Sequence, residues 1–198
     1  MTNSSKQRIE VIAHQTTKQG KTQCGDDYYF SENQDYFICV LADGLGSGPN
    51  AFESSSEVIK VVKNYHHEDV NSMMTRCNDV LFQKRGAAVA ILKVDYKNNE
   101  FIYSCVGNIR FFLYSSMGKL TYPLPVTGYL SGKPQRFNTQ RFPYESSSKF
   151  LLYSDGFDVQ GVKGLLKSYS SIENIAEEIK SKYSSSADDA TFIIGNLL

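Results

Sequence analysis

Short apolar runs recur along the chain and predict a series of buried strands. The predicted strands cover Arg8–His14, Tyr36–Ala42, Ala87–Asp95, Phe101–Val106, Phe111–Ser115, Lys149–Ser154 and Thr191–Gly195. Between the third and fourth of these, Lys97, Asn98 and Asn99 predict the turn of a hairpin.

Three other stretches repeat apolar residues at helical spacing. Their apolar faces are Val58, Val61, Val62 and Tyr65; Val70, Met73, Met74, Cys77 and Leu81; and Ile172, Ile175, Ala176, Ile179 and Tyr183. For the first helix we expect Pro49 in the opening turn and Ser47 or Asn50 as the N-cap. Because the strands follow one another through short turns and the helices come in blocks, the pattern favours a layered, antiparallel α+β fold.

The composition favours a single globular domain over residues 1–198. The 21 acidic residues balance the 21 basic ones, which predicts no affinity for nucleic acid or an anionic membrane. No apolar run reaches the length of a membrane span, and the first ten residues lack the core of a signal peptide. Cys39 lies in a strand-like run and Cys77 on an apolar helical face, so both are predicted to be reduced core thiols, which indicates the cytoplasm. The four cysteines show no CxxC spacing. They are Cys24, Cys39, Cys77 and Cys105.

Acidic residues at the borders of apolar runs are the first candidates for chemistry. Asp43 and Asp155 each begin an Asp-Gly pair, in FICVLADG and FLLYSDG, and no Lys or Arg lies within a few residues of either. Asp26 in CGDDYYF and Asp188 in SSADDATFII occupy similar borders. Each motif alone is also common in turns that have no functional role. If the strand ends meet, however, the gathered carboxylates need a cation, and oxygen ligands suit Mn²⁺ or Mg²⁺.

Other kinds of site fit the sequence poorly. An EF-hand that started at Asp43 would need an oxygen ligand where Leu45 stands. The GLGSG segment lacks the Lys-Ser/Thr ending of a phosphate-binding P-loop. The histidines His14, His66 and His67 lie outside every motif and are expected to be structural or at the surface, which leaves a Ser-His-Asp or Cys-His enzyme without a base.

Read in order, six segments resemble the PP2C superfamily of metal-dependent protein phosphatases, in the bacterial branch that includes the sporulation and stress-response serine phosphatases. The segments are CGDDYYF, ADGLGSG, RGAAVAIL, VGNIR, SDG and DDATFII, and together they span nearly the whole chain. PLPVTGYLSGKPQ (123–135) is similar to the feedback phosphatases of the general stress response. The resemblance implies a four-layer αββα sandwich of two antiparallel sheets flanked by helices, with two Mn²⁺ or Mg²⁺ ions at one rim.

The resemblance also implies a role for each acidic residue at the site. Asp43 would bridge the two ions, and the backbone carbonyl of Gly44 would serve one of them together with Asp26, directly or through water. Asp155 and Asp188 would serve the other ion. These four aspartates are the expected catalytic residues, since the two ions would activate the attacking water and neutralise charge on the phosphoryl group.

The choice among neighbouring acids follows the family pattern, which places the last ligand three residues before the Thr, here Thr191. That pattern selects Asp188 over Asp189. Asp27 and Asp189 are expected to support the ligands or to lie in solvent.

Some positions depart from the pattern. Leu45 stands where many members carry a His that can protonate the leaving group, and Asn108 stands where Asp is frequent. The phosphate-binding Arg of the eukaryotic branch has no secure match, although Lys18 and Lys21 are near, and Arg110 is expected to be structural.

The implied function is a phosphoserine/phosphothreonine protein phosphatase that gives negative feedback on the general stress response. Its expected substrates are phosphorylated STAS-domain proteins of the stressosome, similar to RsbS and RsbR, and the expected state is a monomer. The alternative is a non-catalytic pseudophosphatase that docks on the same partners, and hydrolysis of a small phosphoester is a third possibility. Gly128–Pro134 fits either a partner-specific surface or a simple loop.

Overall fold

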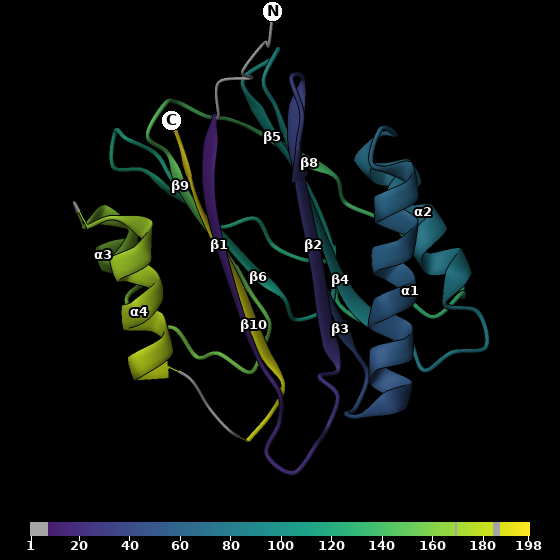
Figure 1. Cartoon of the computed structure of the whole chain (residues 1–198). Helices are drawn as coiled ribbons and strands as arrows, with labels where there is room; N and C mark the ends of the chain where they lie inside the picture. The colour runs from purple at the N-terminus through teal and green to yellow at the C-terminus, as the bar shows by residue number, and fades with distance from the viewer. Residues whose placement is uncertain (1–7, 169, 184–186) are drawn as a thin grey trace, which may run out of the picture.

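The computed structural model describes residues 8–168, 170–183 and 187–198, which form two packed antiparallel sheets with helices on both outer faces (Figure 1). The first sheet contains, in spatial order, β1 (Ile9–Thr16), β10 (Ala190–Leu197), β9 (Lys149–Tyr153), β6 (Arg110–Tyr114) and β7 (Leu120–Thr121). The second contains β2 (Asp26–Glu32), β3 (Tyr36–Gly44), β4 (Ala87–Asp95), β5 (Glu100–Val106) and β8 (Gln140–Pro143). The helices are α1 (Pro49–Tyr65), α2 (Val70–Val80), α3 (Val162–Lys167) and α4 (Ile172–Tyr183).

Three apolar layers hold this sandwich together. The central layer joins the sheets and is rich in aromatic rings, among them Phe37, Phe101, Phe111 and Phe150. A second layer lies between the second sheet and helices α1 and α2, and a third lies between the first sheet and helices α3 and α4. This arrangement confirms the predicted four-layer αββα sandwich.

Strand β3 shows why the middle strands are apolar on both faces. Phe37, Cys39 and Leu41 point into the central layer. The alternate residues Ile38, Val40 and Ala42 point into the layer beneath α1 and α2. A strand covered on both faces carries a continuous apolar run, so the run ends only where Asp43 reaches the edge of the core.

The predicted strands and the three predicted helices all form, but Tyr65 of the first apolar face is 36% exposed. Five further features differ from expectation. Strand β2 is not among the predicted strands, because its residues are mostly half-exposed and do not form an apolar run. The sequence shows only its acidic motif. The short elements β7, β8 and α3 carry too few apolar residues to show a period. The side chain of Tyr183 lies outside the described residues.

The expected N-cap of α1 is the fifth of these differences. Gly48 occupies the cap with φ 77° and offers no side-chain hydrogen bond, whereas Ser47 precedes it and Asn50 lies inside the helix. Glycine adopts this backbone conformation without the steric cost that a side chain would bring. Pro49 does occupy the opening turn, as predicted.

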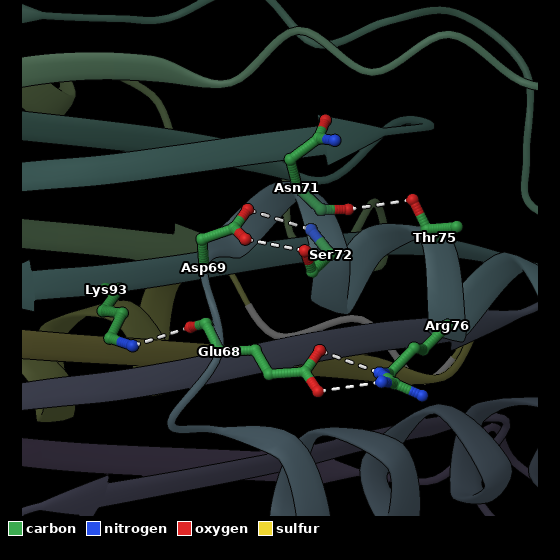
Figure 2. A network of polar contacts seen from close by, with 7 residues as sticks. All are labelled: Glu68, Asp69, Asn71, Ser72, Thr75, Arg76 and Lys93. Carbon is green, nitrogen blue, oxygen red and sulfur yellow. Dashed lines mark hydrogen bonds and ion pairs between the residues drawn. The ribbon is translucent and has the colours of Figure 1, made fainter.

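The connection between α1 and α2 is fixed by a polar network (Figure 2). Asp69 caps α2 by accepting hydrogen bonds from the Ser72 backbone N–H (3.0 Å) and hydroxyl (2.6 Å). The Arg76 guanidinium binds both carboxylate oxygens of Glu68, each at 2.8 Å, and Lys93 Nζ of β4 donates to the Glu68 carbonyl at 2.8 Å. These bonds fasten the helical pair to the second sheet.

The four cysteines are free and buried, which agrees with the prediction for Cys39 and Cys77 and adds Cys24 and Cys105 to the buried thiols. Burial raises the pKa of the Cys24 and Cys105 thiols to about 12, so both stay protonated at neutral pH. Among the described helices, none has both the length and the apolar character that a membrane span requires.

Candidate metal centre

Asp26 and Asp43 lie directly opposite each other at one end of the second sheet. The antiparallel pairing of β2 and β3 places them in register as a cross-strand pair, with Asp43 at the end of its apolar run. Opposed residues on neighbouring strands project to the same side, with their Cβ atoms about 5 Å apart. This end is at the bottom of Figure 1, opposite the end at which β1 starts and the C-terminus lies.

The first sheet brings Asp155 and Asp188 to the same end. Asp155 follows β9 by two residues, and Asp188 precedes β10 by two residues. The β9 and β10 strands pair, so the segments that flank them meet at one edge. All four predicted aspartates therefore reach one end of the sandwich, from both sheets.

A cavity of about 230 Å³ opens between these residues. It is lined by Lys18, Asp43, Leu45, Gly46, Ser47, Asn108, Asp155, Asp188 and Asp189. Asp26 is not part of the lining and is only 2 % exposed. Within the part of the chain that the structure describes, no group of three or more His, Cys, Asp or Glu side chains is arranged so that it could hold a metal ion as it stands.

A hydrogen bond across the two sheets holds Asp26. The Ser154 hydroxyl donates to Asp26 Oδ2 at 2.6 Å and accepts the Thr191 backbone N–H at 2.9 Å. The Gln15 amide donates to the Asp26 backbone carbonyl at 3.0 Å. The other carboxylate oxygen, Asp26 Oδ1, is buried and has no hydrogen-bond partner in the described structure. A buried carboxylate oxygen without a donor is suited to a cation.

The electrostatics of Asp26, Asp43 and Asp155 also favour a cation at this site. Burial raises the pKa of Asp43, and the negative charges of Asp26 and Asp155 raise it further. Burial likewise raises the pKa of Asp26 and of Asp155, although hydrogen bonds from Ser154 and Asn108 oppose these shifts. The nearest lysine, Lys18, has its Nζ 3.5 Å from Asp188 Oδ1 with both groups well exposed, so it neutralises little of this charge.

Asp189 and Asp27, the acidic neighbours of the predicted ligands, differ in their contacts. Asp189 is 4 % exposed, its Oδ1 accepts the Lys18 backbone N–H at 2.8 Å, and its Oδ2 is buried without a partner in the described residues. It is therefore not a solvated residue, whereas Asp188 is exposed. Asp27 alternates with Asp26 along β2 and accepts the N–H of the adjacent Tyr28 at 2.8 Å.

Gly44 lies where a side chain cannot fit. A Cβ at this position would collide with the backbone carbonyl of Ala51 in α1, and the Gly44 N–H donates to the Gly25 carbonyl at 3.1 Å. The close approach of α1 to the end of β3 therefore requires glycine after Asp43.

The positions that depart from the family pattern also lie at or near the cavity. Leu45 lines it and supplies no proton donor, while Asn108 donates to Asp155 Oδ2 at 2.6 Å. Arg110 is not among the lining residues. Sequence reasoning missed Ser154 as a support of Asp26, although its place directly before Asp155 was a usable signal.

Comparisons with known proteins agree with this fold. The model of the Stage II sporulation protein E (SpoIIE) family matches residues 33–196. The phosphoserine phosphatase RsbX of Bacillus subtilis (strain 168) is 43% identical over 191 residues, which are 96% of each chain.

Two solved structures are close as well. A crystal structure of RsbX in complex with magnesium has a TM-score of 0.93 at 43% identity and covers 96% of each chain. A second structure is named "The bacterial stressosome: a modular system that has been adapted to control secondary messenger signaling". It has a TM-score of 0.87 at 25% identity, and the match covers 96% of this chain and 100% of the other. The chain therefore belongs to the SpoIIE family of PP2C-like serine phosphatases.

Proposed function

We propose that this protein is a metal-dependent phosphoserine/phosphothreonine protein phosphatase. The observation that carries the proposal is that one end of the sandwich brings together Asp26 and Asp43 from one sheet with Asp155 and Asp188 from the other, and the last three of these line one cavity. The 43% identity to the phosphoserine phosphatase RsbX supports the same activity.

In this proposal the aspartates hold two Mn²⁺ or Mg²⁺ ions. Asp26, Asp43, Asp155, Asp188 and the Gly44 carbonyl would hold them. The raised pKa values of Asp26, Asp43 and Asp155, together with the unpartnered Asp26 Oδ1, fit such hard cations with an oxygen-only donor set. When bound, the ions supply an activated water and neutralise the charge of the phosphoryl oxygens.

The protein's own residues position these ligands. Ser154 fixes one oxygen of Asp26, so that the other is free to face a cation. Asn108 does the same for Asp155. Hydrogen bonds of this kind commonly change metal affinity or activity by about 10- to 100-fold. Leu45 contributes no proton to the leaving group, so that proton comes from water.

The proposed substrates are phosphorylated STAS-domain proteins of the stressosome, so that dephosphorylation gives negative feedback on the general stress response. We place this activity in the cytoplasm, in a monomer of one domain. The four buried free thiols support a reducing compartment.

A pseudophosphatase that only docks on the same partners is the competing function. It is disfavoured because clustered, partly buried carboxylates destabilise a protein that has no use for a cation. Hydrolysis of a small phosphoester would use the same cavity but would need no protein partner.

The test uses the full chain with a phosphorylated STAS-domain protein and, separately, p-nitrophenyl phosphate. We expect turnover with Mn²⁺, no turnover with chelator, and loss of at least about 100-fold in Asp43→Asn. Asp27→Asn is the matched control, since Asp27 lies on the other face of the same strand, and it should keep its activity. Turnover that survives chelation or Asp43→Asn would contradict the two-metal proposal, and partner binding without any turnover would favour the docking module.

A further inference from the structure

The segment Val126–Lys133, called the strap below, is fastened to the second sheet. Ala87 and Leu130 exchange backbone hydrogen bonds of 3.0 and 2.9 Å, and the Val126 N–H donates to the Cys105 carbonyl at 2.9 Å. Each bond joins the strap to β4 or β5. The strap is therefore a fixed surface and not a free loop.

One buried side chain secures the other end of the strap. The Asn78 amide of α2 donates to the Lys133 carbonyl at 2.8 Å, and its Oδ1 accepts the backbone N–H groups of Ser131 and Gly132, each at 3.1 Å. Asn78 is 7 % exposed, and these three bonds use both the NH₂ group and the carbonyl oxygen of its side chain. The fold thus holds the strap in one conformation.

The strap lies beside the cavity of the metal centre. Gly44 pairs with Ala87 in the sheet, and the N–H of Leu45, which lines the cavity, donates to the Gly86 carbonyl at 3.0 Å. The Tyr129 ring covers Gly86, since a Cβ there would lie 2.9 Å from a ring carbon. A continuous surface therefore runs from the cavity rim over Gly86 to the strap.

Two large aromatic side chains are exposed on this surface. Phe82 is 65% exposed and Tyr129 is 45% exposed. They belong to adjoining segments, because a Cβ on Gly132 of the strap would lie 2.5 Å from the Phe82 Cα. Exposed aromatic residues on an ordered backbone are typical of the centres of protein interfaces.

The charge of this surface is positive. Arg85 is exposed, its Nη1 would lie 2.8 Å from a Cβ on Gly46 at the cavity, and it makes no ion pair with the residues that the structure describes. Lys133, at the end of the strap, is a second exposed cation. A partner that fits this surface carries acidic residues.

We infer that Phe82, Arg85 and Tyr129 form a docking surface for a folded phosphoserine protein whose acidic surface surrounds the phosphoserine. This inference rests on the proposed function and adds to it the residues that select a protein substrate. The aromatic side chains bind the body of the partner while its phosphoserine enters the adjacent cavity, and Arg85 pairs with an acidic residue of the partner. A small phosphoester reaches the cavity without touching these three residues.

The experiment compares the double variant Phe82→Ser/Tyr129→Ser and the charge reversal Arg85→Glu with the wild-type chain. The substrates are a phosphorylated STAS-domain protein, a phosphoserine peptide from it and p-nitrophenyl phosphate, all with Mn²⁺. We expect kcat/KM on the folded phosphoprotein to fall by about tenfold or more in each variant. Hydrolysis of p-nitrophenyl phosphate and of the peptide should change by less than about twofold. Met117→Ser is the matched control, because Met117 is 82% exposed on the turn between β6 and β7.

The outcomes separate the two proposals. Unchanged turnover of the folded phosphoprotein in the variants would overturn the docking surface and leave the proposed function intact. Equal losses on all three substrates would also overturn it, since the damage would then lie in the metal centre or the fold. If the wild-type chain hydrolyses none of them, the proposed function fails. In that case, binding of the phosphoprotein by wild type but not by the double variant would still support the docking surface.

Discussion

Ser154 and Asp26 are 128 residues apart in the chain, yet the Ser154 hydroxyl donates to Asp26 Oδ2 at 2.6 Å inside the protein. Ser154 follows β9 in the first sheet, and Asp26 begins β2 in the second. The bond therefore joins the two sheets at the metal centre and leaves Asp26 Oδ1 as the oxygen without a partner in the described structure.

Substitution Ser154→Ala should weaken metal binding. Without the hydroxyl, Asp26 Oδ2 loses its donor and the carboxylate is no longer held in one orientation, so we expect about 10-fold weaker Mn²⁺ affinity. Titration of metal binding by calorimetry measures this directly. Ser104→Ala is the control, because Ser104 Oγ is buried without a partner in the described residues and its removal should leave affinity unchanged. Equal affinity in Ser154→Ala and wild type would show that the bond does not orient Asp26.

Substitution Asp43→Asn should have opposite effects on the metal-free and metal-loaded proteins. Without metal, burial and the charges of Asp26 and Asp155 raise the pKa of Asp43 to about 9, so at neutral pH folding requires this carboxyl to take up a proton. Asparagine removes that cost, so the melting temperature should rise by several degrees. With Mn²⁺ in excess, wild type should gain stability that the variant does not, since binding to the folded state alone stabilises it. Thermal unfolding with chelator and with metal measures both effects. A lower melting temperature of the variant in chelator would contradict this account.

The stability of the metal-free protein should fall as pH rises. Burial raises the pKa of Asp26, Asp43 and Asp155 above the usual 3.8, so near and above that pH the folded state binds more protons than the unfolded state. Their contribution is complete below pH 3.8 and is lost as the pH rises through the raised values into the neutral range. Saturating Mg²⁺ should reverse the slope, because metal binding requires deprotonated ligands. Melting temperatures between pH 5 and pH 8, with chelator and with Mg²⁺, test both signs. A flat profile in chelator would refute the prediction.

Substitution Gly44→Ala should destabilise the protein strongly. The new methyl group would collide with the Ala51 carbonyl, which forces α1 away from the end of β3, at a cost of about 3 kcal/mol or more. Gly164→Ala is the matched control, since it lies in α3 with no atom within 4 Å of its Cβ position and should be neutral or stabilising by up to about 1 kcal/mol. Chemical denaturation of both variants gives the two free energies of unfolding. Similar stability of Gly44→Ala and wild type would show that α1 can move without cost.

Local patterns predicted the layered antiparallel α+β class and the acidic residues at the strand ends, whereas the four-layer sandwich and the roles of those residues came from the family resemblance. Apolar runs on strands such as β3 and β4 follow from burial on both faces, and the Asp residues at the ends of such runs are visible as breaks in the pattern. The half-exposed β2 lacks such a run, so only its acidic motif was found.

Contacts between distant segments could not be predicted in this way. The Ser154–Asp26 bond and the three bonds of Asn78 to the strap join residues more than 50 positions apart. Their donors and acceptors are common residue types, and only the folded chain shows which of them meet. The Gly48 cap was missed for a related reason, since the backbone turn and not a side chain begins α1.

The division of the acidic residues between two sheets makes the metal centre depend on the packing of the layers. Asp26 and Asp43 belong to one sheet, Asp155 and Asp188 to the other, and the first sheet draws strands from both ends of the chain. The four carboxylates therefore share one end of the molecule only while the two sheets stay packed, and that packing needs the first and the last described strands of the chain.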